Sequence, residues 1–583
     1  MHRGNLPRSL STSALWFGRN STQGTVGESA ANRHARAERV VSMRDPALNP
    51  ETRPTRPRRR DGARDREKET RRVEFDILVV ARNHTSTDRV LEVLHGLGDH
   101  LKPAIKFTID AGSKFARQLG RRLEEMDAEE LPWEEAKSRQ WDLIIAAHAD
   151  SRLGELTGPI LVMPHGVGYN RKRLESTGGE QAAVGTSAHE LMSNGRVYAS
   201  LICLSHEEQR ARLCEDARGH GIVVGDPVLD RLRAGTLLRR DIRRELGAGR
   251  RTVVSISTTW NEYSTLGTRP DVYRRLVAQL PADEYLVLAV FHPNVWFGRS
   301  PYEIRHDFRD ELDSGLVLVD QTTWQAALIA ADIVIGDHGS VTNYGVALDL
   351  PVLLAVDGSK EIDERSPLAG LHAALPHLVD GVPFRDQIEE ALRDHRPDRW
   401  APFVEQLFAM PGRGLESVVN AARSLIGLPP VSAPPRPRRP DSIKVVRGEP
   451  ITAHRVVVRE QRDDPVSLSI ERYPAIVTTR EDHPTSILVI RHDEIYPETR
   501  DLAEIIVHDE PLSAEEAETW LGESLANWGG ALAAAALEGG GCLVRCRDGT
   551  RVSARGDPTT AAITAYWQLV RGNPVTTEDF EVS

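Results

Sequence analysis

Short, almost wholly apolar runs recur along this sequence, and longer stretches of helical character separate them. Such runs are typical of strands buried on both faces, which occur where helices cover both sides of a parallel sheet. Alternating strands and helices therefore predict an α/β fold. The expected strands are Phe75–Val80, Trp141–Ala147, Gly158–Met163, Ala199–Leu204, Thr252–Ser257, Tyr285–Phe291, Leu316–Val319, Ile333–Ile335 and Val352–Ala355.

The expected strands form two consecutive series, which a charged helix over Leu237–Leu246 separates. Each series is long enough for a domain of its own. We therefore predict two Rossmann-like lobes, at residues 74–240 and 241–428, with a helix over Gly414–Leu428 closing the second. Ligands of such sheets bind beyond the carboxyl ends of the strands. Candidate site residues are expected at those ends.

The two ends of the chain differ from this central part. Residues 1–73 lack hydrophobic periodicity and finish in a Pro/Arg-rich run, which predicts a disordered basic tail. Acidic residues among the arginines favour this over an arm that binds lipid or nucleic acid. Residues 429–442 predict a Pro-rich linker. Residues 443–583 are expected to form a smaller α/β or α+β domain of unknown function, with an Ala-rich helix around Ala531.

Composition narrows the classes of partner. The formal net charge of −11 argues against nucleic acid, because a phosphate-binding surface needs a basic excess. Apolar runs stay well short of the roughly 20 residues that span a bilayer, and no apolar signal segment is recognised, so a cytoplasmic protein is expected.

Cys542 and Cys546 have no neighbouring Cys or His pair, so buried thiols are expected rather than zinc ligands.

The first candidate motif follows the expected strand Gly158–Met163. It reads Pro164-His165-Gly166, and Arg171 and Lys172 come a few residues later. A histidine at a strand end is placed for general base catalysis near neutral pH, and the cations suit phosphate. The alternative is a hydrogen-bonded structural histidine beside a solvated basic loop.

Two further strand ends carry polar residues in the second series. His292 follows Tyr285–Phe291, and the proline after it directs the chain out of any helix. Functional and structural interpretations of His292 both stay open. Thr258 follows Thr252–Ser257, where a hydroxyl suits a phosphate or ribose oxygen.

The third motif, Gly336 to Asn343, follows a three-residue strand and begins a helix. Gly339 and Ser340 would expose backbone N–H groups at the helix N-terminus, where the helix dipole favours a diphosphate. Asp337 would cap the helix or orient a hydroxyl, and His338 and Asn343 flank the same turn. The alternative is an ordinary N-cap without a ligand.

Together these motifs resemble the CDP-glycerol glycerophosphotransferases of teichoic-acid synthesis and, more loosely, other GT-B proteins. Pro164-His165-Gly166 is similar to the family's Trp-His-Gly loop, with proline in place of tryptophan. His292 is similar to the family's second strand-end histidine. Gly336–Ser340 resembles its Thr-Asp-Tyr-Ser-Ser signature, although only the Asp and last Ser match. The run Gly225–Asp230 falls where the family has Gly-Asn-Pro-Arg-x-Asp between its lobes.

The resemblance implies a GT-B fold and a transferase that uses a nucleotide-activated donor, either CDP-glycerol or a nucleotide sugar. His165 would be the base for an acceptor hydroxyl on a polyol, glycan or lipid-linked acceptor, with contact at the inner face of the membrane. His292 and Ser340 would hold the donor diphosphate. No metal and no cofactor are expected, because no DxD-like cluster stands at a strand end. A UDP-sugar 2-epimerase-like enzyme and a catalytically degenerate nucleotide-binding scaffold are the alternatives.

Overall fold

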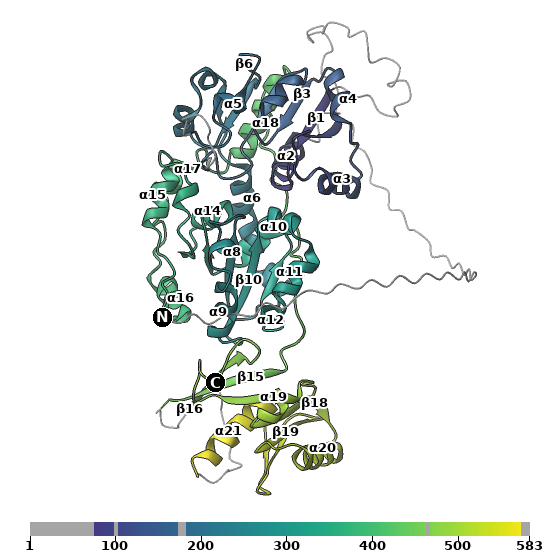
Figure 1. Cartoon of the computed structure of the whole chain (residues 1–583), viewed down its shortest axis with the longest axis vertical. Helices are drawn as coiled ribbons and strands as arrows, with labels where there is room; N and C mark the ends of the chain where they lie inside the picture. The colour runs from purple at the N-terminus through teal and green to yellow at the C-terminus, as the bar shows by residue number, and fades with distance from the viewer. Residues whose placement is uncertain (1–74, 98–102, 173–181, 462–466, 573–583) are drawn as a thin grey trace, which may run out of the picture. The chain divides into compact units, whose positions relative to one another are not determined.

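A computed structural model describes residues 75–97, 103–172, 182–461 and 467–572 (Figure 1). All of them belong to one compact unit, residues 69–583. The expected tail, residues 1–73, lies outside the described residues.

Six parallel strands form the first sheet, in the order β2-β1-β3-β4-β7-β8. The apolar runs become its central strands because every side chain of β3 and β4 is buried, as a strand covered on both faces requires. The strand β2, which sequence analysis missed, adds to its edge and carries half-buried residues. The strands are β1 (Phe75–Ala81), β2 (Pro103–Ile109), β3 (Leu143–Ala146), β4 (Ile160–Val162), β7 (Leu201–Leu204) and β8 (Gly221–Val223).

Helices and short turns connect these strands, and a small separate hairpin lies between β4 and β7. The elements are α2 (His84–Leu97), α3 (Ala116–Glu125), α4 (Trp133–Ser138), η2 (Ser151–Glu155), α5 (Ala188–Leu191), β5 (Met192–Ser193), β6 (Arg196–Val197), η3 (Glu207–Arg212), η4 (Glu215–His220) and α6 (Pro227–Gly235).

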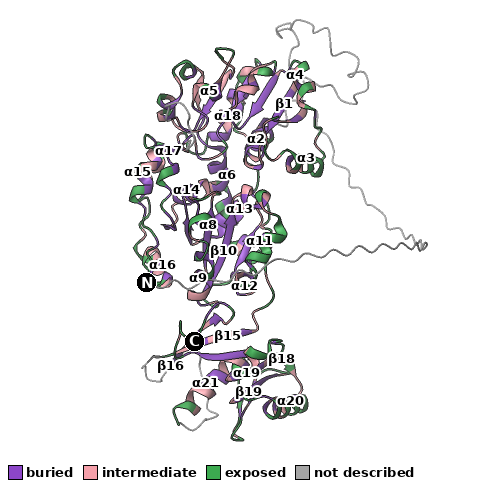
Figure 2. Cartoon of the chain, in the orientation of Figure 1, coloured by how far each residue is buried: buried purple, intermediate pink, exposed green. Residues whose placement is uncertain are grey.

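The second sheet has the order β13-β12-β9-β10-β11-β14, with every pair parallel except β11 and β14. Its middle strand β10 is buried along its whole length, and Figure 2 shows the central strands of both sheets as buried. The expected helix over Leu237–Leu246 is a 3-10 turn followed by a shorter α-helix. The strands are β9 (Thr252–Thr258), β10 (Tyr285–Phe291), β11 (Val317–Val319), β12 (Ile333–Gly336), β13 (Val352–Leu354) and β14 (Val445–Val446).

The helical elements of this part run from the end of α6 to the Pro-rich segment. They are η5 (Thr236–Leu238), α7 (Arg239–Glu245), α8 (Thr265–Thr268), α9 (Val272–Gln279), α10 (Pro293–Gly298), α11 (Pro301–Asp307), α12 (Arg309–Leu312), α13 (Trp324–Ala330), α14 (Ser340–Ala347), η6 (Ser359–Glu361), α15 (Pro367–Ala374), α16 (Phe384–Asp394), α17 (Ala401–Leu407) and α18 (Gly414–Leu425).

The helix α18 packs on the first sheet, whereas the sequence predicted that it closes the second lobe. Its apolar side chains Leu415, Val418 and Val419 belong to the core cluster built around β1. A Cβ at Gly96 of α2 would lie 2.8 Å from the Val419 side chain, so the glycine permits this close contact. Periodicity finds an apolar face but does not tell which sheet covers it.

Residues beyond the Pro-rich segment contribute to two sheets. The strand β14 pairs with β11 of the second sheet, although it lies within the range predicted for the C-terminal domain. The seven-stranded third sheet has the order β16-β15-β17-β18-β19-β20-β21. Its elements are β15 (Ala453–Gln461), β16 (Ser467–Pro474), β17 (Ile487–Arg491), α19 (Pro497–Leu502), β18 (Ile505–Leu512), α20 (Ala514–Asn527), β19 (Leu532–Leu537), β20 (Cys542–Cys546), β21 (Arg551–Ala554) and α21 (Pro558–Val570).

The alanine run that predicted a helix around Ala531 is the strand β19. Its residues alternate between two core clusters, one shared with α20 and one with α21. Burial between two helices overrides the helix propensity of alanine, because small side chains let both helices approach the strand. Cys542 and Cys546 of β20 are buried free thiols, and burial raises the pKa of each to about 11.

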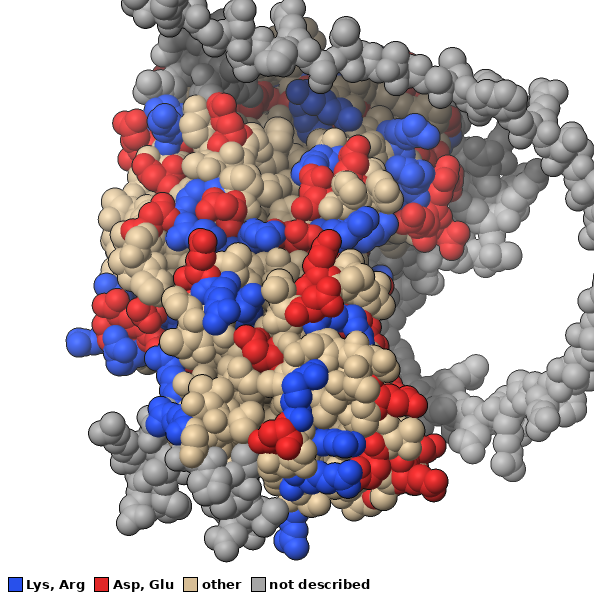
Figure 3. Space-filling model, turned by 60° about the horizontal axis from the view of Figure 1, so that its bottom comes forward, with Lys and Arg blue, Asp and Glu red and all other residues tan. Residues whose placement is uncertain are grey.

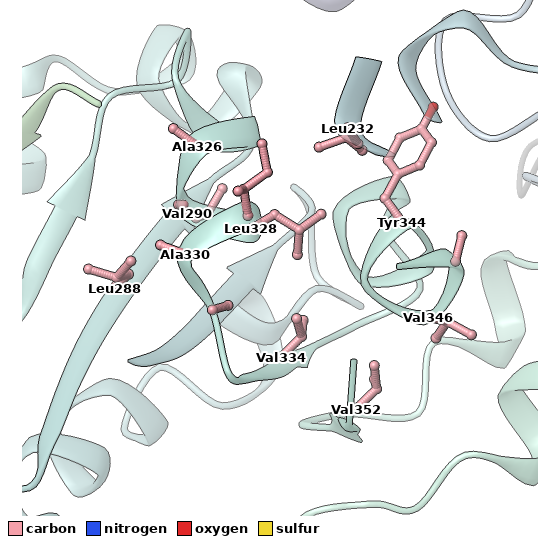
Figure 4. Close-up of a cluster of buried hydrophobic side chains, with 14 of the residues drawn as sticks. Leu232, Leu288, Val290, Ala326, Leu328, Ala330, Val334, Tyr344, Val346 and Val352 are labelled. Carbon is pink, nitrogen blue, oxygen red and sulfur yellow. The ribbon is translucent and has the colours of Figure 1, made fainter. Parts of the chain in front are cut away.

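The largest core cluster lies on one face of the second sheet (Figure 4). In this view the Tyr344 hydroxyl points away from the neighbouring apolar side chains. The cluster therefore ends at a polar contact, which belongs to the site described below. Labelled members of the cluster are Leu232, Leu288, Val290, Ala326, Leu328, Ala330, Val334, Tyr344, Val346 and Val352.

The surface carries both basic and acidic side chains. On the face shown in Figure 3, basic and acidic side chains are interspersed. Within the described ranges, none of the helices combines the length and apolar character needed to cross a membrane.

Candidate functional site

A cavity of about 940 Å³ is lined by residues from both Rossmann-like sheets. His165 after β4, His292 after β10 and Ser340 at the start of α14 all lie on its wall. The volume suits a ligand of nucleotide size. The carboxyl ends of strands in two different sheets thus meet at one cavity, as parallel sheets favour.

One buried arginine connects the His165 loop with both lobes. Arg89 of α2 donates to the Gly166 carbonyl at 3.0 Å, to Asp226 at 2.7 Å and to the Tyr344 hydroxyl at 2.7 Å. The Tyr344 hydroxyl donates in turn to Asp226 at 2.9 Å. Asp226 also caps α6 by accepting from the N–H groups of Val228 and Leu229. A fully hydrogen-bonded charge pair of this kind fixes the loop.

The Arg89–Asp226–Tyr344 cluster was missed by the sequence analysis. Arg89 is 5% exposed, which is rare for an arginine unless it is paired. Asp226 stands in the Gly225–Asp230 run, so that run was the available signal, but its partners lie far away in the sequence.

His165 is exposed to the cavity, and among the described residues no group forms a hydrogen bond with it. Surrounding protein keeps bulk water away and, with the nearby positive charges of Arg89 and Arg171, lowers its pKa to about 4. The imidazole is therefore neutral at pH 7, and its unprotonated ring nitrogen is free to accept a proton.

His292 is half-buried and held more tightly. Its Nδ1 accepts a hydrogen bond from the Asn294 N–H at 3.0 Å, which makes it the N-cap of α10. Because Nδ1 accepts, the proton of the neutral ring lies on Nε2, which can only donate. Burial, together with His165 and Arg171, lowers the pKa of His292 to about 3. The geometry suits a hydrogen-bond donor to a ligand oxygen.

The start of α14 lies against the His165 loop. The Ser340 Oγ accepts from the Val167 N–H at 3.3 Å, and a Cβ at Gly166 would stand 2.5 Å from that oxygen. A glycine is needed here for this close approach. Within the described part of the chain, no side chain caps the first turn of α14. The first-turn amides have no acceptor within the helix, so they suit an anion.

Gly339 differs from its expected arrangement, whereas Asp337 accepts from the Thr259 hydroxyl at 3.0 Å. The Gly339 N–H donates to Asp337 Oδ1 at 2.9 Å, so it is not free for a ligand. Asp337 Oδ2 accepts from Thr259 N at 2.7 Å and from Thr265 N at 2.9 Å. The fully buried Asp337 thus fixes the loops after β9 and β12, which makes it a positioning residue.

His338 and Arg171 share a partner. Glu361 accepts from His338 Nε2 at 2.7 Å, from Asn261 Nδ2 at 2.6 Å and from Arg171 Nη2 at 3.3 Å. Burial alone would raise the Glu361 pKa, but His338 and Arg171 lower it below its usual value. The charge of Arg171 is thus partly compensated before any ligand binds.

Lys172 departs from the expected phosphate contact. It pairs with Glu364 at 3.0 Å and is not among the residues that line the cavity. Its backbone N–H donates to the Glu361 carbonyl at 2.7 Å, next to the bridge between Arg171 and Ile362. Arg171 and Lys172 therefore connect the two lobes, and of these two only Arg171 also lines the cavity.

Thr258 and Asn343 both line the cavity and are buried. The Thr258 hydroxyl accepts from the Leu266 N–H at 3.0 Å and donates to the Thr259 carbonyl at 3.0 Å, so its bonding capacity is largely used. The Asn343 Oδ1 is buried and has no hydrogen-bond partner among the residues that the structure describes. In the described part of the chain, no group of three or more His, Cys, Asp or Glu residues is arranged to hold a metal.

Comparisons of sequence give no relative: no protein-family model matches, and no curated protein matches. Solved structures do match. Staphylococcus aureus MnaA with UDP is 12% identical, with a TM-score of 0.40 over 63% of this chain and 100% of that chain. The wall teichoic acid polymerase TagF is 12% identical, with a TM-score of 0.39 over 61% and 90%.

A putative UDP-N-acetylglucosamine 2-epimerase from Listeria monocytogenes is 13% identical, with a TM-score of 0.37 over 60% of this chain and 96% of that chain. Each of these three solved structures resembles this chain only distantly. The two Rossmann-like lobes are established by the strand order and pairing of the chain itself.

Proposed function

We propose that this protein is a transferase that moves a glycerophosphate or glycosyl group from a nucleotide-activated donor to an acceptor hydroxyl. One observation carries the proposal: histidines from the strand ends of two different lobes line one cavity of about 940 Å³. A cavity between two Rossmann-like sheets suits a donor on one lobe and an acceptor on the other. CDP-glycerol and nucleotide sugars are the donors that the sequence motifs favour.

His165 is the general base in this proposal. The acceptor oxygen forms a bond to the reacting atom of the donor, the bond from that atom to the nucleotide phosphate breaks, and the acceptor proton moves to His165. Its low pKa, about 4, keeps the ring neutral in the empty cavity. The negative diphosphate of a bound donor offsets nearby arginines, which raises this pKa and makes the ring a better base.

The donor diphosphate is held by His292 Nε2–H, the Ser340 hydroxyl and the first-turn amides of α14. These donors are fixed before a ligand arrives, because His292 is a helix cap and Ser340 lies against the Val167 N–H. Preorganised donors stabilise the charge that builds up on the leaving nucleotide. No step in this scheme calls for a metal. The acceptor is a polyol, a glycan or a lipid-linked molecule at the inner face of the membrane.

The test is incubation of the purified protein with CDP-, UDP- and GDP-activated donors, with nucleotide release as the readout. We expect release from one donor class, and loss of release in His165→Ala. Conversion of a UDP-sugar to its 2-epimer without transfer would support the epimerase-like alternative. Absence of binding to any nucleotide would contradict the proposal and favour a scaffold.

A further inference from the structure

The loop after β9 presents a large aromatic side chain to the cavity. Trp260 lines the cavity and is 37% exposed, which makes it the most exposed tryptophan in the described part of the chain. Trp141, Trp296 and Trp400 are instead buried in hydrophobic cores. An uncovered indole ring favours a ligand that covers it, because apolar surface is then removed from water. The Trp260 ring is therefore available to a ligand.

Hydrogen bonds fix the backbone on both sides of Trp260. The Thr259 N–H and hydroxyl both donate to Asp337, at 2.7 Å and 3.0 Å. The Asn261 side chain donates to Glu361 at 2.6 Å. Asn261 has a φ of 82°, in the left-handed region that asparagine tolerates better than most residues. The loop therefore holds the backbone of Trp260 at the cavity wall before a ligand arrives.

An arginine of the first lobe lies over the indole. The Arg171 guanidinium is 5.2 Å from the centroid of the Trp260 ring, within the range of a cation–π interaction. Its hydrogen bond to Glu361 at 3.3 Å uses one of the five N–H donors of the guanidinium. Burial and, among the nearby charges, Arg171 lower the pKa of both His165 and His292. The Arg171–Trp260 pair therefore lies near both histidines.

The strand order places this pair beside the groups that are proposed to hold the donor diphosphate. The strand β9 lies between β10, which His292 follows, and β12, which leads to Ser340. Arg171 comes from the same loop as His165, so a molecule on the Arg171–Trp260 pair contacts both lobes near the proposed general base. An acceptor must occupy this position, because its hydroxyl has to reach the base and the donor together.

We infer that Trp260 and Arg171 bind the acceptor and that the acceptor is a saccharide. A pyranose ring has a flat face of C–H groups, which packs on an indole, and a rim of hydroxyls, which accept from a guanidinium. An open-chain polyol lacks the flat face, and a lipid chain lacks the hydroxyls. The inference rests on the proposed function and selects a glycan among its acceptor classes.

The first experiment detects binding without turnover. The tryptophans of the full chain are replaced by fluorotryptophan, and the Trp260 resonance is followed by fluorine NMR and assigned by its absence from Trp260→Phe. The probes are the methyl glycosides of glucose, galactose, mannose and N-acetylglucosamine, with glycerol and ribitol as open-chain polyols. Each probe is added with and without CDP, UDP or GDP. The same probes then serve as acceptors in the nucleotide-release assay.

We expect a glycoside, but neither polyol, to shift the Trp260 resonance and to accelerate nucleotide release. Trp260→Ala should raise the KM for that glycoside roughly tenfold, as for the loss of one ring contact, and leave the affinity for the nucleoside diphosphate unchanged in calorimetric titration. Trp260→Phe keeps a smaller aromatic face and should lose less. Trp567→Ala is the matched control, because Trp567 also lies against an arginine, Arg571, but does not line the cavity.

Three results would overturn the inference. Equal shifts with glycosides and polyols would remove the preference for a ring. An unshifted Trp260 resonance with every glycoside would place the acceptor elsewhere, while His165-dependent nucleotide release would still support the proposed function. Weaker binding of the nucleoside diphosphate or of the intact donor to Trp260→Ala would assign the indole to the donor.

Failure of the proposed function is a separate outcome. A glycoside that shifts the Trp260 resonance in a protein that releases no nucleotide from any donor would contradict the transferase and keep Trp260 as a saccharide site.

Discussion

His165 and His292 share one sequence pattern, a histidine directly after or soon after a buried strand, and differ in their surroundings. His165 is exposed to the cavity and forms no hydrogen bond with the described residues. His292 is half-buried, and its Nδ1 accepts the Asn294 N–H at 3.0 Å. The first ring therefore has an unprotonated nitrogen free to take up a proton, whereas the Nε2–H of the second ring can only donate.

The comparison teaches that the local motif fixes position but not role. Both residues lie at strand ends because buried strands in parallel sheets must deliver them there. Their hydrogen bonds differ because Pro293 turns the chain into α10 directly after His292, whereas glycines after His165 lead into a loop that Arg89 anchors. The predictions below test whether this structural difference is a functional one.

The largest expected effect is on the anchor of the His165 loop. Arg89→Met would leave Asp226 as a buried charge without its partner, which costs about 3–5 kcal/mol. We expect the melting temperature to fall by roughly 3–5 °C, measured by thermal unfolding. The variant Arg89→Met/Asp226→Asn should recover at least half of the loss. No recovery would mean that Arg89 acts through packing rather than through charge.

His165→Ala should cut turnover by roughly 100-fold or more and leave nucleotide affinity nearly unchanged, because a general base acts in the transition state. A nucleotide-release assay and calorimetric titration measure the two quantities. His306→Ala serves as the control, because His306 is an exposed histidine of α11 away from the cavity. Lost nucleotide binding with retained turnover would place His165 in the donor site instead.

His292 should affect binding and turnover together, since a group on the diphosphate serves the ground state and the transition state. We expect His292→Ala to weaken nucleotide binding about tenfold, as for one hydrogen bond to a charged group, and to slow turnover as well. His292→Gln, which keeps a side-chain N–H donor, should retain more of both. A loss of turnover with unchanged nucleotide affinity would show that His292 and His165 have the same role.

Ser340→Ala should mainly weaken nucleotide binding, by about 1 kcal/mol for one hydrogen bond. Ser340 also accepts the Val167 N–H, so the melting temperature must be recorded beside the affinity. An unchanged affinity with a lower melting temperature would restrict Ser340 to holding the His165 loop.

The smallest expected effect is that of pH near neutrality. The pKa of His165 is lowered to about 4 and that of His292 to about 3, so both rings are neutral from pH 6 to 8. We expect kcat/KM to be flat over that range and to fall only below about pH 5, as the base becomes protonated. A fall near pH 6.5 would indicate an ordinary histidine in the free protein.

Folding stability should follow the same pKa shifts. The pKa of each ring is lower in the folded state than in the unfolded chain, so protons favour the unfolded chain. The contribution of the two neutral rings to the free energy of unfolding is complete above the usual histidine pKa of 6.5. This contribution is lost as the pH falls toward 4. Thermal unfolding of His292→Gln at pH 5 and pH 7 measures this, and the variant should lose less stability on acidification than the wild type.

The alternation of apolar runs determined the α/β class, the two parallel sheets and the strand ends at which His165, His292 and Ser340 stand. These features follow from local periodicity, because a strand covered on both faces must be apolar along its length. Long-range packing decided the sheet that α18 covers, the conversion of the alanine run around Ala534 into a strand, and the pairing of β14 with β11.

The same limit holds for the site. The sequence identified His165 and His292 but not Arg89 or Tyr344, whose partners are distant along the chain. It also predicted free amides at Gly339 and a phosphate contact at Lys172, which Asp337 and Glu364 instead engage. Sequence periodicity indicates which face of its own helix or strand a residue occupies. Only the tertiary structure decides which distant charges and hydrogen-bonding groups become neighbours.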